Sequence, residues 1–291
     1  MGRVTRNRTV LKVRVQPGSG PQVSRRGDVL AVEEPLDVRL DGEPYLVTMR
    51  TPGDDIDLVH GLLHGEGVIT SAEDVLLARY CAGTGPDGMN TYNVLDVSLV
   101  PERARPAGEP RRQVVMNSAC GICGSTSIDQ VVDARRHPVT HAEPVPVEHL
   151  LRAPDLLREQ QRTFQRTGGL HAAGLMDASG RLLCVREDVG RHNAVDKVVG
   201  WALRAGRLPL AGCALVVSSR ASYELTQKAV AAGAEMLVAV SAPSSLAVEL
   251  ADEAGLTLVG FVRGESLNVY AHPERIDLST ADAPVEVPAA G

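Results

Sequence analysis

Two cysteines in a short glycine-rich segment are the residues of this sequence best suited to covalent chemistry. Cys120 and Cys123 lie three positions apart, and a glycine follows each of them. Thiols at this spacing can approach one another or a shared partner, and local N–H groups stabilise the thiolate, which is the reactive form. Such a thiolate can attack a sulfane donor and hold the sulfur as a persulfide, which a neighbouring thiol helps to release.

Other roles for this cysteine pair stay open on the residues alone. A structural zinc site needs four ligands, usually from a second pair, but Cys81, Cys184 and Cys213 are isolated. A thioredoxin-like pair should open a helix directly after a strand, and inert thiols are rarely set among glycines and serines. A zinc deaminase-like site could use His141 and Glu143 as its His-x-Glu pattern, although the cysteines here precede that pattern instead of following it.

A dense charged run forms the second candidate site. Residues 186–197 contain seven charged or imidazole side chains between an expected strand and an expected helix. Backbone N–H groups converge at such a junction, so a ligand with phosphates or hydroxyls could bind there. A solvated helix start is the alternative. The candidate binding residues of this run are Glu187, Asp188, Arg191 and His192.

Further segments leave expected strands and could line the same crevice. Hydroxyls and free helix N–H groups can hold a phosphate at the carboxyl edge of a parallel sheet, although the serines could equally be N-cap and loop residues. His171, on a strand of small residues, is expected to be a satisfied core histidine. The candidates at the strand ends are Ser218, Ser219, Arg220, Phe261, Val262, Arg263, Gly264, Glu265 and Ser266.

The elements that position these residues follow two patterns. In the first part, short alternating segments predict strands, and one helix is expected at about 54–64, so this part should be mainly antiparallel β. The second part predicts a hairpin, a buried helix at 192–205 and a β-α-β-α-β run, which implies parallel strands covered by helices in a three-layer α/β domain. The expected strands are 10–15, 36–40, 45–49, 92–99, 170–176, 182–186, 214–217, 236–240 and 256–261, with helices at 222–232 and 245–254.

The bulk properties set the remaining expectations. A polar, proline-rich joint at 137–146 predicts an N-terminal domain, 1–140, that ends in the cysteine loop, and a C-terminal domain, 141–291. The net charge of −6 does not favour a nucleic-acid partner. Neither a signal-peptide core nor a run of 18 apolar residues occurs, so we expect a cytoplasmic protein without a membrane span. Exposed sheet edges favour a homodimer.

Taken together, the motifs resemble the FdhD family, whose members are formate dehydrogenase accessory sulfurtransferases. The resemblance rests on residues 117–124, 168–173, 187–197 and 218–220, in that order. Residues 51–55 and 268–270 extend it over most of the chain.

The resemblance implies a function that composition does not show. Such proteins accept sulfur from a cysteine desulfurase as a persulfide. They pass it to the molybdenum cofactor, in its bis(molybdopterin guanine dinucleotide) form, before that cofactor enters formate dehydrogenase. The resemblance implies that Cys120 bears the persulfide, that Cys123 assists it, and that segment 261–266 contacts the cofactor. It also implies a C-terminal domain similar to the cytidine deaminase fold, with no metal of its own. A non-catalytic cofactor chaperone remains an alternative.

Overall fold

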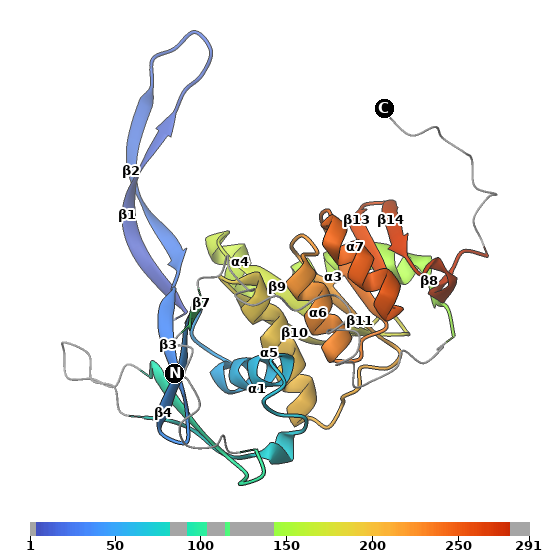
Figure 1. The fold of residues 1–291 in the computed structure, drawn as a ribbon. Coiled ribbons are helices and arrows are strands. Elements are labelled where there is room, and N and C mark those ends of the chain that lie inside the picture. The colour runs from blue at the N-terminus through green and yellow to red at the C-terminus, as the bar shows by residue number, and fades with distance from the viewer. Residues whose placement is uncertain (1–3, 82–91, 104–113, 117–142, 280–291) are drawn as a thin grey trace.

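The computed structural model of the protein describes residues 4–81, 92–103, 114–116 and 143–279. Within them, two sheets are joined by a pair of packed helices, and a long two-stranded arm projects from one end (Figure 1). The cysteine pair at 120 and 123 and the expected domain boundary near residue 140 lie outside the described residues. The division into two domains therefore stays a prediction.

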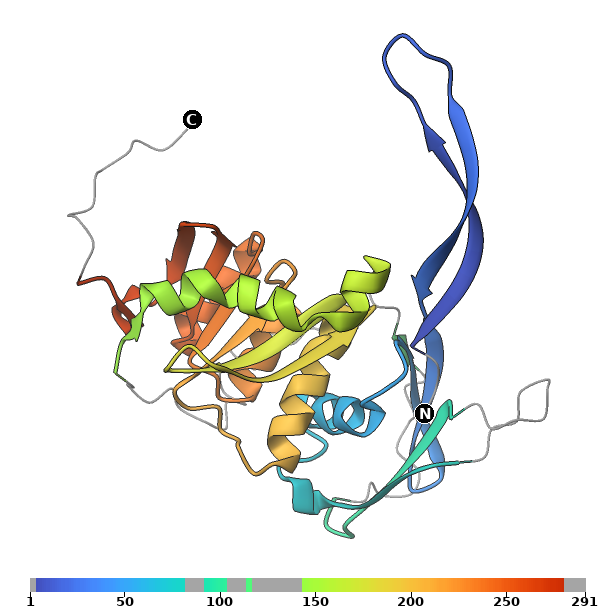
Figure 2. The same cartoon turned by 180° about the vertical axis from the view of Figure 1, so that it is seen from behind.

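The arm is an antiparallel hairpin of β1 (Thr5–Arg14) and β2 (Gln22–Ala31). Both views of the molecule show it extending well beyond the other elements (Figures 1 and 2). After it, five strands form a sheet in the order β5-β6-β3-β4-β7. Their bounds are β3 (Glu34–Leu40), β4 (Glu43–Arg50), β5 (Val75–Tyr80), β6 (Val94–Leu99) and β7 (Val114–Met116).

The pairing in this sheet is mixed. β3 and β4 are antiparallel, as are β5 and β6, which agrees with the expected antiparallel character. However, β6 and β7 run parallel to the strands beside them, β3 and β4. A parallel pair needs a crossover connection between its two strands. Here α1 (Asp55–Gly65) and η1 (Ala72–Asp74) lie between β4 and the later strands. The alternation of residues along a single strand does not show whether its neighbour runs parallel or antiparallel.

Helix α1 lies between this sheet and α5 (Arg191–Arg204) of the second half, and the two helices make the most extensive contact between helices in the described residues. Their backbones touch at two glycines. A Cβ atom at Gly61 would lie 1.9 Å from the carbonyl oxygen of Asp196, and one at Gly200 would lie 1.8 Å from that of Asp57. Any larger residue at either position would force the helices apart, so the crossing requires glycine on both sides.

The second sheet has six strands in the order β10-β9-β11-β12-β13-β14. The three strands β11, β12 and β13 are parallel, while the outer pairs are antiparallel. Helices α5, α6 (Tyr223–Ala231) and α7 (Ser245–Ala254) cover one face, and α3 (Val147–Gln160) covers the other, followed by the short α4 (Arg162–Thr167). The strands are β9 (His171–Asp177), β10 (Leu182–Asp188), β11 (Cys213–Val217), β12 (Met236–Ala239), β13 (Thr257–Arg263) and β14 (Ser266–Ala271). A small β8 (Val145–Pro146) pairs with β15 (Ile276–Asp277), which follows η2 (Pro273–Arg275).

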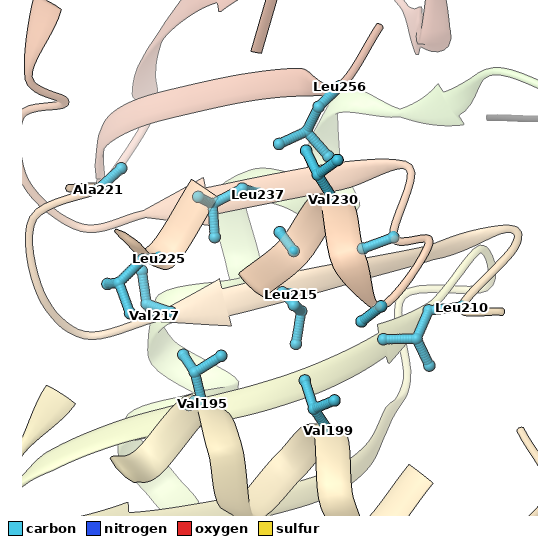
Figure 3. Packing of buried hydrophobic residues seen from close by; sticks show 14 of the residues in the cluster. Val195, Val199, Leu210, Leu215, Val217, Ala221, Leu225, Val230, Leu237 and Leu256 are labelled. Atoms are coloured by element: carbon cyan, nitrogen blue, oxygen red, sulfur yellow. The ribbon is translucent and has the colours of Figure 1, made fainter. Parts of the chain in front are cut away.

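Alternate residues of β11 show how this sheet becomes the middle layer. Leu215 and Val217 pack toward α5, α6 and α7, as Figure 3 shows from close by. Ala214 and Val216 pack on the opposite side, toward α3. A period of two places successive side chains on opposite faces, and burying each Leu or Val contributes about 1.5–3 kcal/mol. The expected three-layer arrangement and the β-α-β-α-β run are confirmed.

Several elements were not expected from the sequence, namely β2, β5, β7, β14, α3 and α4, together with the short β8, β15, η1 and η2. The expected helices at 54–64 and 192–205 and the hairpin of β9 and β10 are confirmed within one or two residues at most of their ends. The likeness to the cytidine deaminase fold remains an expectation. Within the described residues, none of the helices is both long and apolar enough to cross a membrane.

Candidate functional site

A pocket of about 930 Å³ opens at the carboxyl ends of the parallel strands. This edge of an open α/β sheet is where such folds usually bind ligands, because the loops that leave adjacent strands diverge there. The lining comes from four places: the ends of β11 and β12, the end of β13 with the turn after it, the edge of β9 and β10, and α3 with α4. The lining residues are Leu151, Pro154, Asp155, Leu157, Arg158, Gln161, Phe164, Gly168, Gly169, Leu170, His171, Val189, Ser218, Val240, Ser241, Phe261, Val262, Arg263 and Gly264.

The pocket brings together two of the candidate segments that the sequence indicated. Ser218 lies at the end of β11, and its backbone N–H donates to the carbonyl oxygen of Ala172 at 3.0 Å. Its hydroxyl oxygen accepts a hydrogen bond from the N–H of Ala172 at 2.9 Å. A hydroxyl that accepts one bond can still donate another, so the Ser218 hydroxyl is held in place with a donor left for a ligand.

The end of β13 and the turn that follows it supply the other segment, Phe261 to Gly264. Phe261 adopts a left-handed backbone conformation with φ 52°, and its side chain is 48% exposed. A bulky residue seldom adopts this conformation, and such strain tends to persist at functional sites. Its N–H donates to the carbonyl oxygen of Ser241 at 3.2 Å, so this part of β13 is tied to the segment that follows β12. The aromatic side chain is therefore presented at the pocket by the irregular end of β13.

The wall built by α3 and α4 was missed by the sequence reasoning. Arg158 stacks over the ring of Phe164, with its guanidinium carbon 3.9 Å from the ring centre. The Glu187 carboxylate, expected to contact a ligand, instead accepts hydrogen bonds from the N–H groups of Thr163 and Phe164, at 2.8 and 2.7 Å. Glu187 thus holds the first turn of α4, where helix N–H groups otherwise lack partners, and with it this wall of the pocket.

His171 also lines the pocket, although the sequence indicated a core position. Its side chain is half-buried at the start of β9. Burial lowers the pKa of His171, and the positive charge of Arg191 lowers it further, while Asp188 acts in the opposite direction. The imidazole is therefore neutral at neutral pH and can either donate or accept a hydrogen bond in the pocket.

Asp188 is wholly buried and serves the fold. Its carboxylate lies 2.8 Å from the Nζ of Lys197 and accepts a hydrogen bond from the N–H of Thr51 at 3.1 Å. It also accepts bonds from the N–H of Gly190 and from the side-chain amide of Asn193. These contacts join the end of β4 to the start of α5, so the carboxylate is occupied within the protein.

Arg191 and His192 lie at the start of α5, outside the pocket lining. Burial, and then the nearby charges of Arg191 and Lys228, lower the pKa of His192 to about 4, although Glu224 opposes them. The His192 Nε2 atom lies 3.7 Å from the Glu224 carboxylate. Since the imidazole is neutral at neutral pH, this contact is not an ion pair there. The remaining candidates Ser219, Arg220, Glu265 and Ser266 also lie outside the described lining.

Two of the described cysteines, Cys184 and Cys213, are poor nucleophiles. Burial raises the pKa of the Cys184 thiol to about 11 and also raises the pKa of Cys213. A thiolate is the reactive form, so both thiols are inert at neutral pH. In the described part of the chain, His, Cys, Asp and Glu side chains do not gather in groups of three that could hold a metal ion. The residues of the zinc alternative, 120, 123 and 141, lie outside the described residues.

The strand that leads to the cysteine pair has a defined position. β7 ends at Met116, which pairs with Thr48 of β4. The Thr48 hydroxyl lies 3.5 Å from the side-chain oxygen of Asn193 at the start of α5. Asn193 in turn contacts Asp188, and Val189 lines the pocket. A continuous set of contacts therefore connects the end of β7 to the pocket.

Comparison with known proteins identifies the family. Residues 31–277 match the FdhD/NarQ family. The chain is 56% identical over 276 residues to a Nocardia farcinica protein named sulfur carrier protein FdhD, covering 94% of this chain and 96% of that protein. A Streptomyces avermitilis protein of the same name is 53% identical over 285 residues, covering 97% and 99%. A crystal structure from Desulfotalea psychrophila, provisionally described as a formate dehydrogenase accessory protein, has a TM-score of 0.69 at 26% identity, covering 93% and 99%. The chain belongs to the FdhD/NarQ family.

Proposed function

We propose that this protein is a sulfur carrier for formate dehydrogenase, with Cys120 as the residue that bears the sulfur. A cysteine desulfurase supplies the sulfur, and the bis(molybdopterin guanine dinucleotide) molybdenum cofactor is the cargo that receives it before entering the dehydrogenase. The observation that carries the proposal is the match, over nearly the whole chain, to relatives named sulfur carrier proteins. The motif with Cys120 and Cys123 supplies the chemistry.

The loading step is an exchange without net oxidation. The Cys120 thiolate attacks the outer sulfur of the desulfurase persulfide, the old sulfur–sulfur bond breaks, and the desulfurase leaves as a thiolate. Cys123 can assist release by the same exchange chemistry. The raised pKa of Cys184 and of Cys213 supports the assignment, because neither competes for the sulfur at neutral pH.

The described residues also support the assignment by position. Cys120 follows Met116, the last residue of β7, by four residues, and four residues of chain span at most about 14 Å. The end of β7 lies in the set of contacts that runs through Thr48 and Asn193 toward the pocket. These contacts support the proposal, because they join the strand that precedes Cys120 in the sequence to residues beside the pocket.

The pocket is the proposed seat of the guanine-nucleotide end of the cargo. Its volume of about 930 Å³ falls in the range of small-molecule sites, roughly 300–1,000 Å³. Arg158 and Arg263 supply positive charge for phosphates, and the Ser218 hydroxyl supplies a positioned donor. Phe261 at the rim offers an aromatic face on which a purine can stack.

Intact-mass spectrometry tests the carrier role. The reduced, folded protein is incubated with a cysteine desulfurase and cysteine, and we expect one added sulfur atom, absent in Cys120→Ala. Cys184→Ala is the matched control and should gain the sulfur as wild type does, because Cys184 is buried. Complementation of a strain that lacks the accessory factor should fail with Cys120→Ala. A chaperone without sulfur chemistry would instead still restore dehydrogenase activity in that variant.

Calorimetric titration with guanosine diphosphate tests the pocket. Arg158→Ala and Arg263→Ala should each weaken binding by roughly tenfold to a hundredfold, as expected for a lost hydrogen bond to a charged group. Arg152→Ala is the matched control, since Arg152 lies on the same helix, α3, but outside the lining. Equal affinity in all three variants would exclude this pocket as the nucleotide seat.

A further inference from the structure

Polar atoms are buried without a partner where α5 and α6 begin. Arg191 and His192 are the first two residues of α5, and Tyr223 is the first residue of α6. Within the described residues, the Nε atom of Arg191, the Nε2 atom of His192 and the hydroxyl of Tyr223 are buried and have no hydrogen-bond partner. Burying a polar atom unpaired is costly, so such an atom usually meets a water molecule or a ligand.

These side chains belong to one cluster. The Nε2 atom of His192 lies 3.7 Å from the carboxylate of Glu224, the second residue of α6. This distance joins the two helix starts but is too long for a hydrogen bond. Burial, and then the charge of Arg191, lower the pKa of His192, while burial and then the charge of Glu224 raise the pKa of Tyr223. Each group therefore lies within the electric field of the next. We call Arg191, His192, Tyr223 and Glu224 the helix-start cluster.

Tyr223 is the most constrained member of the cluster. The residue is 5% exposed and belongs to the hydrophobic core that α5, α6 and α7 form on their face of the sheet. A buried tyrosine usually finds a hydrogen-bond partner for its hydroxyl. Because the packed ring cannot turn this hydroxyl into solvent, the hydroxyl is positioned for a molecule bound inside the cluster.

The donors of the cluster favour an oxyanion. The Arg191 Nε–H and the Tyr223 hydroxyl can donate, as can a neutral His192 ring, and none of them has an acceptor within hydrogen-bond distance among the described residues. Gly190 precedes α5 without a side chain to cap it, and the Ser222 side chain before α6 makes no capping hydrogen bond. Two uncapped helix starts attract negative charge. The matching ligand is an anion with several acceptor oxygens.

Glu224 narrows the choice of oxyanion. Burial raises the pKa of its carboxyl, but a hydrogen bond from its own N–H and the nearby positive charges outweigh burial, so the pKa is lowered and the group is ionised at neutral pH. A carboxylate only accepts hydrogen bonds. Hydrogen phosphate has a hydroxyl that can donate to it, whereas sulfate has no proton at neutral pH and would set a charged oxygen against the carboxylate. Such a repulsive contact discriminates between similar ligands.

We propose that the helix-start cluster is a second binding site, which holds one protonated phosphate group between the starts of α5 and α6. Arg191, His192 and Tyr223 donate to its unprotonated oxygens, and Glu224 accepts from its hydroxyl. All four residues lie outside the described lining of the pocket. The assignment therefore does not depend on Cys120 or on the nucleotide seat.

Calorimetric titration of the full chain with inorganic phosphate tests the proposal. We expect one phosphate to bind per chain, and sulfate to bind at least tenfold more weakly. Tyr223→Phe removes only the unpartnered hydroxyl and should weaken phosphate binding roughly tenfold to a hundredfold, as expected for a lost hydrogen bond to a charged group. Tyr270→Phe, on β14, is the matched control and should bind phosphate as wild type does. Glu224→Gln should reduce the preference for phosphate over sulfate, because an amide can donate to an unprotonated oxygen.

Thermal melting shows whether the variant is folded. In buffer without phosphate, Tyr223→Phe should melt at the temperature of wild type or above it, because the lost hydroxyl has no partner there. Added phosphate should raise the melting temperature of wild type more than that of Tyr223→Phe. Titration with glycerol phosphate distinguishes a free phosphate from one carried on a larger molecule, since the tighter binder of the two names the source.

Any of four results would overturn the proposal. A wild type that binds no phosphate would mean that water alone satisfies the cluster. Equal phosphate affinities for wild type and Tyr223→Phe would place the phosphate elsewhere, and loss of phosphate binding in Arg158→Ala would place it in the pocket. Equal binding of phosphate and sulfate by wild type would remove Glu224 from the recognition. Guanosine diphosphate affinity and sulfur loading of Cys120, measured in the same samples, report separately on the proposed function.

Discussion

Replacing Lys197 by methionine should destabilise the protein strongly, because it leaves a charge without its partner in the interior. The Lys197 side chain is 1% exposed and that of Asp188 is 0% exposed, and their charged atoms lie 2.8 Å apart. The ammonium group also donates to the carbonyl oxygens of Thr51 and Glu187, at 2.9 and 3.3 Å. Methionine has a similar shape, so the change removes mainly the charge and these three contacts.

The expected cost follows from these contacts. Removing one partner of a buried ion pair costs about 3–5 kcal/mol, because the other charge stays buried. Asp188 keeps N–H donors from Thr51, Gly190 and Asn193, which favours the middle of this range, about 4 kcal/mol. With an unfolding entropy of about 2.1 cal/mol/K per residue, the 291 residues give about 0.6 kcal/mol per degree, so the melting temperature should fall by about 7 °C.

Chemical denaturation and thermal melting measure this effect. Arg39→Met is the matched control, since Arg39 pairs with Asp37 at the surface and should cost less than about 1 kcal/mol. The double variant Lys197→Met with Asp188→Asn should lose less unfolding free energy than the two single variants lose together, because it removes both charges. A loss for Lys197→Met no larger than that for Arg39→Met would refute the reasoning.

Three further outcomes are expected. Glu187→Gln should lower the unfolding free energy by about 1–2 kcal/mol through loss of the carboxylate that holds α4, and denaturation should show no such loss for Glu159→Gln on the surface. The pKa of His192 is lowered from 6.5 to about 4, so the unfolded chain alone takes up this proton as the pH falls from 6.5 toward 4. Stability should drop across that window by up to about 3 kcal/mol, and denaturation at several pH values should show a smaller drop in His192→Gln. Iodoacetamide at neutral pH, followed by peptide mapping, should label Cys184 and Cys213 only after unfolding; rapid labelling of either in the folded protein would contradict the raised pKa of these thiols.

The sequence predicted the helices and strands whose apolar residues recur at a regular spacing. It missed a helix where a proline interrupts such a spacing. Helix α5 and the parallel strands were found because their apolar residues recur at helical or strand spacing. Helix α3 has the same helical spacing at Leu150, Ala153 and Leu157. Pro154 in its interior normally argues against a helix, and the sequence analysis predicted no element over these residues. The aromatic and basic wall of the pocket was missed with it.

The charged run at 187–197 shows a different limit. Its density of charge indicated a binding site, but density does not reveal the partners of each side chain. The Asp188 carboxylate accepts a hydrogen bond from the N–H of Thr51, more than a hundred residues earlier in the chain. The Glu187 carboxylate accepts one from the first turn of α4. The sequence analysis predicted that the candidate residues at the strand ends would line one crevice. Of these candidates, Ser218 and Phe261 to Gly264 line the pocket. The cysteine pair lies outside the described residues, so its role rests on the proposal and its tests.

The sequence by itself determined the reactive residue types, the order of the motifs and the family to which the chain belongs, because each of these is written in consecutive residues. The tertiary structure decided which of the charged groups are bonded within the fold and which face the pocket. It also decided that α1 and α5 meet through two glycines and that the helix-start cluster forms between α5 and α6. These depend on contacts between segments far apart in the chain, and the energy of such contacts is not visible in local periodicity.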